Sequence, residues 1–317
     1  MAADPMLIIS ARIISARPGL ALDHPQARTI RSAVADYWAL TKPEVSFLIA
    51  IATFTGFYLA LPASVPDLPW LRLMNTLLGT LLVASGTGTL NQYIERGFDA
   101  QMRRTARRPL AAGRLKPSPV LWFGITLASI GGIYLATAVN LLASLLAIVT
   151  LLSYLFLYTP LKRQTPACVL VGALPGAVPP LIGWAAASGK LRLEAWELYA
   201  MLFLWQFPHF MAIAWMYRED YDRAGYLVLP HGQTRASFVT LQTMLPLLAL
   251  LPVSVLPASA GRLSIFYCIG ALLLSLGFFY CGTQFVLYRS SAAARQLLLA
   301  SIIYLPSLFV LIMLFRG

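Results

Sequence analysis

The chain has 317 residues, of which 59% are apolar or aromatic and only 11% are charged. A soluble domain is typically about a quarter charged, so this composition argues against a soluble enzyme. A mean hydropathy of +0.72 also excludes a disordered chain. The 24 Lys and Arg outnumber the 12 Asp and Glu, which gives a formal net charge of +12. These values indicate a polytopic membrane protein with basic loops.

The apolar windows predict an all-α bundle of about nine transmembrane helices, because a membrane helix needs roughly 20 mostly apolar residues. Residues 1–40 are predicted to form a basic, disordered tail, and residues 41–317 a single membrane-embedded domain. Proline within a span is expected to kink the helix without breaking it. The approximate spans are 45–62, 72–92, 118–136, 139–158, 167–188, 196–217, 236–256, 263–285 and 296–315.

Lys and Arg are divided unevenly between the two sides of this predicted bundle. The side of the N-terminal tail carries 19 of them and the other side carries five. Cytoplasmic loops hold the excess of positive charge, so we expect a cytoplasmic N-terminus and an external C-terminus. The bacterial inner (plasma) membrane is the expected location. Membrane lipid, and no nucleic acid, is the expected partner of the basic loops.

One acidic stretch lies where the second predicted span ends. Asn91, Glu95 and Asp99 are spaced i, i+4, i+8, which places them along one face of a helix. Their oxygens suit Mg²⁺, whose coordination is often completed by substrate phosphates. Arginines follow, and we expect Arg103 and Arg107 to bind a diphosphate. An ordinary helix end would explain the arginines but not the spacing of the acids.

A second stretch closes the sixth predicted span. Asp220 is a candidate to complete a metal–diphosphate site and Arg218 to bind phosphate oxygens, although the stretch alone also fits an ordinary span end. His209 lies about two turns inside the span, where an ionisable residue indicates function by default. The alternative is a buried histidine that is satisfied by a carbonyl freed by Pro208.

A third stretch follows the fourth predicted span on the same side and contains Tyr158, Lys162 and Arg163. The second and sixth spans are four apart and end in similar loops. This weak similarity suggests a four-helix unit used twice, which would bring the two acidic loops together over one cavity.

Four motifs resemble the UbiA-type intramembrane prenyltransferases, over about residues 38–315. They are Asn91-xxx-Glu95-xxx-Asp99, then Asp-Ala-x-Met-x-Arg-Thr-x-x-Arg-Pro-Leu from Asp99, Tyr-Thr-Pro-Leu-Lys-Arg-x-Thr-Pro from Tyr158, and Trp-Gln-x-Pro-His-Phe from Trp205. The second acidic motif departs from the family. Tyr217 and Tyr221 stand where Asp-xxx-Asp is widely seen, with Asp220 between them.

This resemblance implies a helical bundle around a central cavity and Mg²⁺-assisted transfer from farnesyl diphosphate. The motifs from Asp99 and Trp205 resemble the branch that farnesylates a vinyl group of haem B to make haem O, which a haem A synthase or a terminal oxidase then uses. The resemblance implies a catalytic role for Tyr158 and haem binding by His209. It implies metal binding by Asn91, Glu95, Asp99 and Asp220, and diphosphate binding by Arg103, Arg107, Lys162, Arg163 and Arg218.

Two other functions stay open at this point. One keeps the chemistry and changes the acceptor to a 4-hydroxybenzoate or chlorophyllide type of aromatic compound. The other is an ion-coupled transporter, in which the acids would couple ions to substrate flux. A transporter predicts acids deep within the spans. These acids instead lie at span ends beside arginines, which favours phosphate chemistry.

Overall fold

The computed structural model describes residues 30–62, 67–232, 234–259 and 264–315. The chain divides into two compact units, Met1–Ala35 and Asp36–Gly317. Of the first unit only residues 30–35 are described, and they begin helix α2 (Ile30–Leu40). The last eleven residues of the predicted tail are therefore helical, whereas residues 1–29 lie outside the described part.

The nine predicted spans are confirmed in the described part of the chain, where nine helical segments are long and apolar enough to cross a membrane. Two of the segments are composite: α6 (Leu141–Ser153) continues through a π-helical turn (Tyr154–Tyr158) into α7 (Thr159–Leu161), and α8 (Cys168–Gly176) is followed by α9 (Pro179–Ser188). The others are α3 (Pro43–Ala60), α4 (Trp70–Asp99), α5 (Pro117–Ala138), α10 (Leu193–Met216), α12 (Thr234–Val253), α14 (Ile265–Tyr288) and α15 (Ser291–Leu314). Two short helices, α11 (Arg218–Arg223) and α13 (Leu256–Ser259), lie in the connections.

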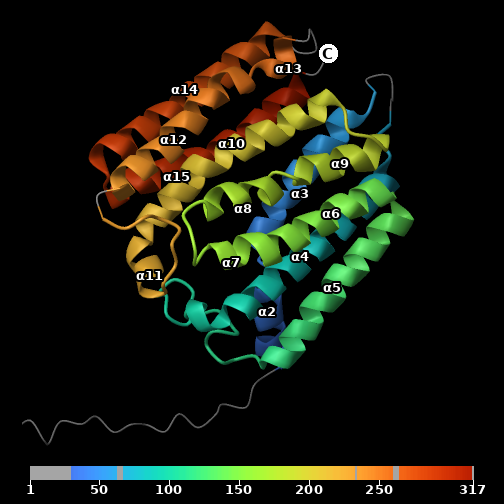
Figure 1. Cartoon of the computed structure of the whole chain (residues 1–317). Helices are drawn as coiled ribbons and strands as arrows, with labels where there is room; N and C mark the ends of the chain where they lie inside the picture. Colours follow the sequence, from blue (N-terminus) through green and yellow to red (C-terminus); the bar gives the residue numbers. More distant parts are fainter. Residues whose placement is uncertain (1–29, 63–66, 233, 260–263, 316–317) are drawn as a thin grey trace, which may run out of the picture. The chain divides into compact units, whose positions relative to one another are not determined.

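Within the second unit, α10 packs against α12, α15, α8 and α9, while α3 packs along α9 and α4 along α5 (Figure 1). All nine spans expose large apolar side chains, among them Leu71, Ile133 and Leu273. Such outer faces suit contact with lipid tails, where the backbone groups must be satisfied within each helix.

Helices α3 and α9 approach closely because glycine lies at their contact. A Cβ atom on Gly183 would collide with the carbonyl oxygen of Thr53, and one on Gly56 would collide with that of Pro180. Small residues let membrane helices pack backbone against backbone, where dispersion contacts stabilise the pair.

The prolines behave in two ways. Pro208 and Pro306 lie inside unbroken helices, as expected. The fifth span, in contrast, is interrupted between Gly176 and Pro179, so the expectation of a simple kink was wrong there. Pro179 and Pro180 are consecutive and both lack an N–H, which leaves two donors missing from the same helical turn.

The π-helical turn in the fourth span also has a proline beside it. Pro160 has no N–H to continue the α-helical ladder, and the Tyr154 carbonyl accepts both the backbone N–H of Thr159 and its hydroxyl, the latter at 2.9 Å. Such turns occur mostly as single bulges, frequently at functional sites. Here the turn and the short helix α7 lead to Lys162, whose side chain contacts Glu95 of α4.

Candidate active site

The acidic residues of α4 form one continuous buried face. The helix continues beyond the predicted end at residue 92 as far as Asp99, which confirms that Asn91, Glu95 and Asp99 share a helical face. Their exposed fractions are only 1%, 5% and 1%. We call these three residues the acid face. Buried carboxylates are costly unless they are paired, so partners must come from elsewhere in the fold.

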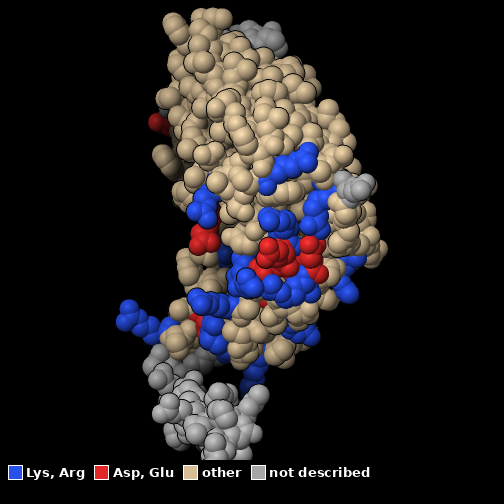
Figure 2. All heavy atoms as spheres, turned by 90° about the vertical axis from the view of Figure 1, so that its left-hand side faces the viewer, with Lys and Arg blue, Asp and Glu red and all other residues tan. Residues whose placement is uncertain are grey.

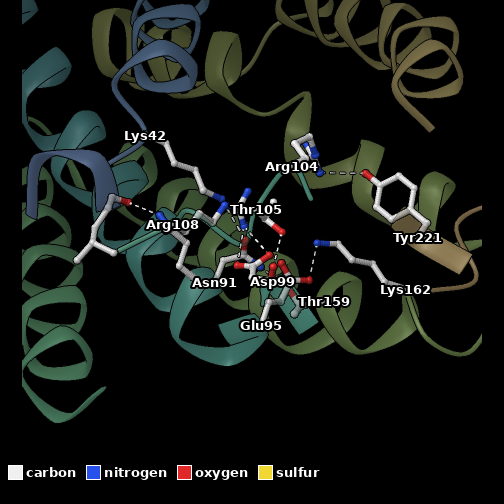
Figure 3. Close-up of polar contacts among 12 residues, drawn as sticks. Lys42, Asn91, Glu95, Asp99, Arg104, Thr105, Arg108, Thr159, Lys162 and Tyr221 are labelled. Atoms are coloured by element: carbon white, nitrogen blue, oxygen red, sulfur yellow. Dashed lines mark hydrogen bonds and ion pairs between the residues drawn. The ribbon is translucent and has the colours of Figure 1, made fainter. Parts of the chain in front are cut away.

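Two of the partners are cations that hold the carboxylates directly (Figure 3). Lys162 Nζ donates to Glu95 Oε1 at 2.8 Å from the segment after α7. Arg108 Nη1 donates to both Asp99 oxygens, at 2.8 and 2.7 Å, from the loop after α4. The loop is thereby folded back over the end of its own helix.

Lys42 supplies the third cation from the elbow between α2 and α3. Its Nζ donates to Asn91 Oδ1 at 3.0 Å, and its backbone has a left-handed φ of 50°, rare for a residue with a side chain. The elbow is fixed by Gln92 Nε2, which donates to the Leu40 carbonyl at 3.1 Å. Burial, and next to it the charge of Arg108, lower the pKa of Lys42 to about 7. We call Lys42, Lys162 and Arg108 the cation ring.

Aromatic rings surround Lys162. Its Nζ lies 4.5 Å from the centroid of the Tyr158 ring, and the rings of Tyr154 and Tyr158 lie 5.1 Å apart. Burial would lower the pKa of Lys162, but Tyr158 and Glu95 beside it raise that pKa well above its usual value. Gly172 leaves room for the Tyr158 ring, since a Cβ there would come within 2.6 Å of two ring carbons.

Asp220 joins the second acidic loop to the first. Its Oδ2 accepts the backbone N–H of Arg104 at 3.1 Å, and its Oδ1 accepts Arg223 Nη1 at 3.2 Å. Burial would raise the pKa of Asp220, but the hydrogen bonds from the backbone of Arg104 and Arg103 and the charge of Arg223 lower it. The two loops therefore meet, as the weak repeat predicted.

In the described ranges, no group of three or more His, Cys, Asp and Glu side chains is placed to hold a metal ion. Asp220 thus does not form such a group with Glu95 and Asp99. Its role as a metal ligand stays a prediction, because its carboxylate here accepts hydrogen bonds from protein groups.

Arg104 lies on the two tyrosines that replace acids of the family pattern. Its guanidinium carbon is 4.9 Å from the Tyr217 ring centroid and 5.9 Å from that of Tyr221, and Nη2 donates to the Tyr221 hydroxyl at 3.3 Å. Thus a positive side chain lies over the Tyr217 ring and bonds to the Tyr221 hydroxyl, and Figure 3 draws the second contact.

The remaining predicted diphosphate ligands lie around the acid face rather than on it. Arg103 and Arg107 are exposed, Arg163 lies over the Phe98 ring at 4.4 Å, and Arg218 donates to the Trp215 carbonyl at 2.9 Å. None of these four arginines bonds to the acid face within the described residues. Figure 2 shows Lys, Arg, Asp and Glu gathered on one part of the face in view, and much of the rest of that face has none.

His209 is separate from these charges. Its Nδ1 lies 2.8 Å from Ser301 Oγ of α15, and its ring stacks on Trp205 with centroids 4.6 Å apart. The structure therefore pairs this histidine with a side chain and not with a carbonyl freed by Pro208.

Sequence analysis missed Lys42 and Arg108. Each bonds to the acid face from a distant or folded-back segment, which residue spacing along α4 cannot reveal. Signals existed nonetheless: Lys42 directly precedes the proline that starts a span, and Arg108 belongs to the quoted Arg-Thr-x-x-Arg-Pro motif. The buried Tyr226 was also missed; its hydroxyl lies beside the Glu95 carboxylate. Burial raises the pKa of Tyr226, and the nearby charge of Glu95 raises it further.

Residues 49–305 match the UbiA prenyltransferase family. The chain belongs to that family, and the nine apolar helices of its described residues are those of a multi-pass integral membrane protein. Among curated proteins it is similar to one named protoheme IX farnesyltransferase from Solibacter usitatus (strain Ellin6076). The two are 47% identical over 287 residues, which are 89% of this chain and 98% of the relative.

Solved structures agree on the fold. A digeranylgeranylglyceryl phosphate synthase matches with a TM-score of 0.70 at 18% identity, covering 89% of this chain and 97% of that one. A UbiA homolog from Archaeoglobus fulgidus, bound to GPP and Mg²⁺, matches with a TM-score of 0.60 at 13% identity, covering 87% and 99%. The all-α membrane bundle predicted from the sequence is thereby confirmed.

Proposed function

We propose that this protein transfers a farnesyl group from farnesyl diphosphate to a vinyl group of haem B, giving haem O. The observation that carries the transferase chemistry is the buried acid face held by the cation ring. The name of the curated relative, protoheme IX farnesyltransferase, supports haem B as the acceptor. No feature of the structure favours another aromatic acceptor or a transporter.

The charges of the site support binding of an anion together with a metal. Two carboxylates face three basic side chains, and because the pKa of Lys42 is about 7, the site has at most one formal positive charge in excess. A lone cation would be repelled by this excess, whereas a prenyl diphosphate is attracted to it. Diphosphate oxygens would replace carboxylate oxygens as acceptors for the cation ring, which frees the acid face for a metal.

The acid face fits Mg²⁺ by its donor chemistry. Two carboxylates and an amide provide hard oxygen ligands along one helix, and the Tyr226 hydroxyl lies beside Glu95. Asn91, Glu95 and Asp99 would hold the ion, and Asp220 is kept as a predicted fourth ligand. Bound there, Mg²⁺ would neutralise charge on the diphosphate as it leaves.

The chain's own residues would do the rest. The cation ring binds diphosphate oxygens, and the exposed arginines around it attract the anion from solution. When the C–O bond breaks, Tyr158 presents its ring to the allylic cation, which an aromatic face stabilises by roughly 0.5–2 kcal/mol. The vinyl carbon then bonds to the farnesyl carbon, water bonds through its oxygen to the neighbouring carbon, and the proton that this water loses passes to the departed diphosphate.

The membrane setting suits both substrates. The farnesyl chain and the porphyrin are apolar, whereas the diphosphate and the haem propionates carry charge. We propose that His209 binds haem and that a haem A synthase or an oxidase assembly protein receives the product. We also propose that the charged loops lie on the cytoplasmic side of a bacterial inner membrane. The 19 to 5 division of Lys and Arg supports this orientation.

The test is the mass of haem extracted after membranes with this protein are incubated with haem B, farnesyl diphosphate and Mg²⁺. We expect haem heavier by one farnesyl and one hydroxyl group. Glu95→Ala and Asp99→Ala, or chelation of Mg²⁺, should abolish the product. Unchanged haem from folded protein would contradict haem B as the acceptor, and transfer to 4-hydroxybenzoate would then identify the alternative.

A further inference from the structure

Ser301 on α15 makes three contacts around His209 on α10. Its Oγ lies 2.8 Å from His209 Nδ1 and 2.6 Å from the carbonyl oxygen of Leu298, one turn earlier in its own helix. Its own carbonyl accepts Trp205 Nε1 at 2.8 Å, and the Trp205 ring stacks on the imidazole. Ser301 is fully buried, with 0% of its surface exposed. Lipid and water therefore do not compete for these contacts.

The distances fix where the protons lie. Two oxygens only 2.6 Å apart repel unless a proton lies between them, so the Ser301 hydroxyl must donate to the Leu298 carbonyl. A serine hydroxyl has a single proton, and its oxygen can then only accept from the imidazole. Neutral His209 therefore carries its proton on Nδ1, and its Nε2 has a bare lone pair.

Nε2 is available to a ligand. Within the described residues Nε2 has no hydrogen-bond partner, and the protein does not fully enclose it. The ring is only partly buried. A neutral imidazole with one bare nitrogen is the commonest protein ligand for metals, and such histidines usually donate the other N–H to an acceptor.

We infer that Ser301 is a positioning residue that presents His209 Nε2 to the iron of a bound haem. The inference rests on the proposed function, since haem is the acceptor there. Trp205 limits ring rotation by stacking, and Ser301 selects the tautomer. Iron ligation would set the position of the porphyrin, and hence of its vinyl groups, relative to the farnesyl diphosphate.

The experiment is a titration of purified full-length protein with ferric haem, without farnesyl diphosphate, read by absorption and electron paramagnetic resonance. The ferrous form is read by the resonance Raman iron–histidine stretch. Ser301→Ala should weaken haem binding by about 10- to 100-fold and diminish the histidine signature, as loss of a partner of a metal-bound histidine typically does. Ser301→Thr keeps a hydroxyl and should restore both. Ser144→Ala is the matched control, because Ser144 is another buried serine that donates to a helix carbonyl, that of Gly132.

His209→Ala should abolish the iron–histidine signature, and added imidazole should bring it back. The inference is overturned if Ser301→Ala binds haem as the unchanged protein does, or if His209→Ala keeps the signature. Failure of the proposed function looks different: haem is bound through His209 but is never farnesylated. Conversely, farnesylation without a histidine signature overturns only the role given to His209 and Ser301.

Discussion

Lys42 holds its amine against Asn91 from a backbone conformation that most side chains avoid. Such strain persists only where surrounding contacts fix it, and it clusters at functional sites. Gly88 adds a further sign of fit, because a Cβ there would already touch the Lys42 side chain at 3.4 Å. At the scale of single residues, the elbow between α2 and α3 thus places the Lys42 amine against the acid face.

Replacing Lys42 by methionine should therefore weaken binding of farnesyl diphosphate. A hydrogen bond between charged groups contributes about 1.5–3 kcal/mol, so we expect KM for farnesyl diphosphate to rise about 10-fold or more. KM for haem should not change. Lys116→Met is the control, since Lys116 is an exposed lysine just before α5. Equal effects of the two substitutions on KM would show that only net charge matters.

Asp220 offers a second residue-scale prediction. Its carboxylate anchors the loop that carries Arg104, so Asp220→Asn should lower the rate of farnesyl transfer by loosening that loop. Because Asp220 is proposed as a fourth metal ligand, the Mg²⁺ concentration needed for half-maximal rate should rise in Asp220→Asn, whereas it should stay unchanged in Arg223→Ala, which removes the other partner of Asp220. An unchanged Mg²⁺ requirement in Asp220→Asn would instead limit Asp220 to anchoring the loop.

Spacing along one helix was enough to predict the acid face, because i, i+4, i+8 is a local property of the chain. Its partners were partly predictable: Lys162 was recognised by motif, whereas Lys42 and Arg108 were not. Lys42 meets Asn91 across 49 positions of sequence, and Arg108 meets Asp99 only because the loop folds back. Such contacts depend on tertiary packing, which no periodicity encodes.

At the scale of elements, helix packing depends on glycine where α3 crosses α9. Gly183→Ala should destabilise the protein by about 1–3 kcal/mol, the usual cost of overpacking, because the added Cβ collides with backbone that cannot rotate away. Gly277→Ala on α14 is the matched control, with nothing within 4 Å of the added Cβ. The measurement is the thermal unfolding midpoint in detergent. Equal midpoints for the two variants would contradict tight α3–α9 packing.

Hydropathy predicted the existence of every span, because burial in lipid demands long apolar helices whatever their neighbours. It did not predict where the helices change type. The π-helical turn before Thr159 and the interruption before Pro179 both lie beside prolines, which lack an N–H. In the first case the Tyr154 carbonyl accepts both the N–H and the hydroxyl of Thr159, a contact that depends on side-chain geometry.

At the scale of the whole second unit, the site is assembled from chain segments that alternate with membrane crossings. The acid face ends the second span, and the segment with Lys162 and helix α11 follow the fourth and sixth spans. The Leu227 N–H donates to the Lys162 carbonyl at 2.6 Å. Even-numbered spans of a chain that enters from one side all end on that same side. The contacts among these segments therefore require an even number of crossings between them, in agreement with the two spans that separate each segment from the next.

The same alternation, together with the division of Lys and Arg, predicts which loops face the cytoplasm. We expect Ala112→Cys, in the loop after α4, to be protected from a membrane-impermeant maleimide in spheroplasts, and Lys190→Cys, between α9 and α10, to react. Both positions are exposed, so accessibility to solvent within the fold does not separate them. The background would lack Cys168, Cys268 and Cys281, the free cysteines of the described residues. Detergent permeabilisation is the control and should make Ala112→Cys reactive. The reversed pattern would place the acid face and its diphosphate on the external side, away from cytoplasmic prenyl diphosphates, and would contradict the orientation inferred from the division of Lys and Arg.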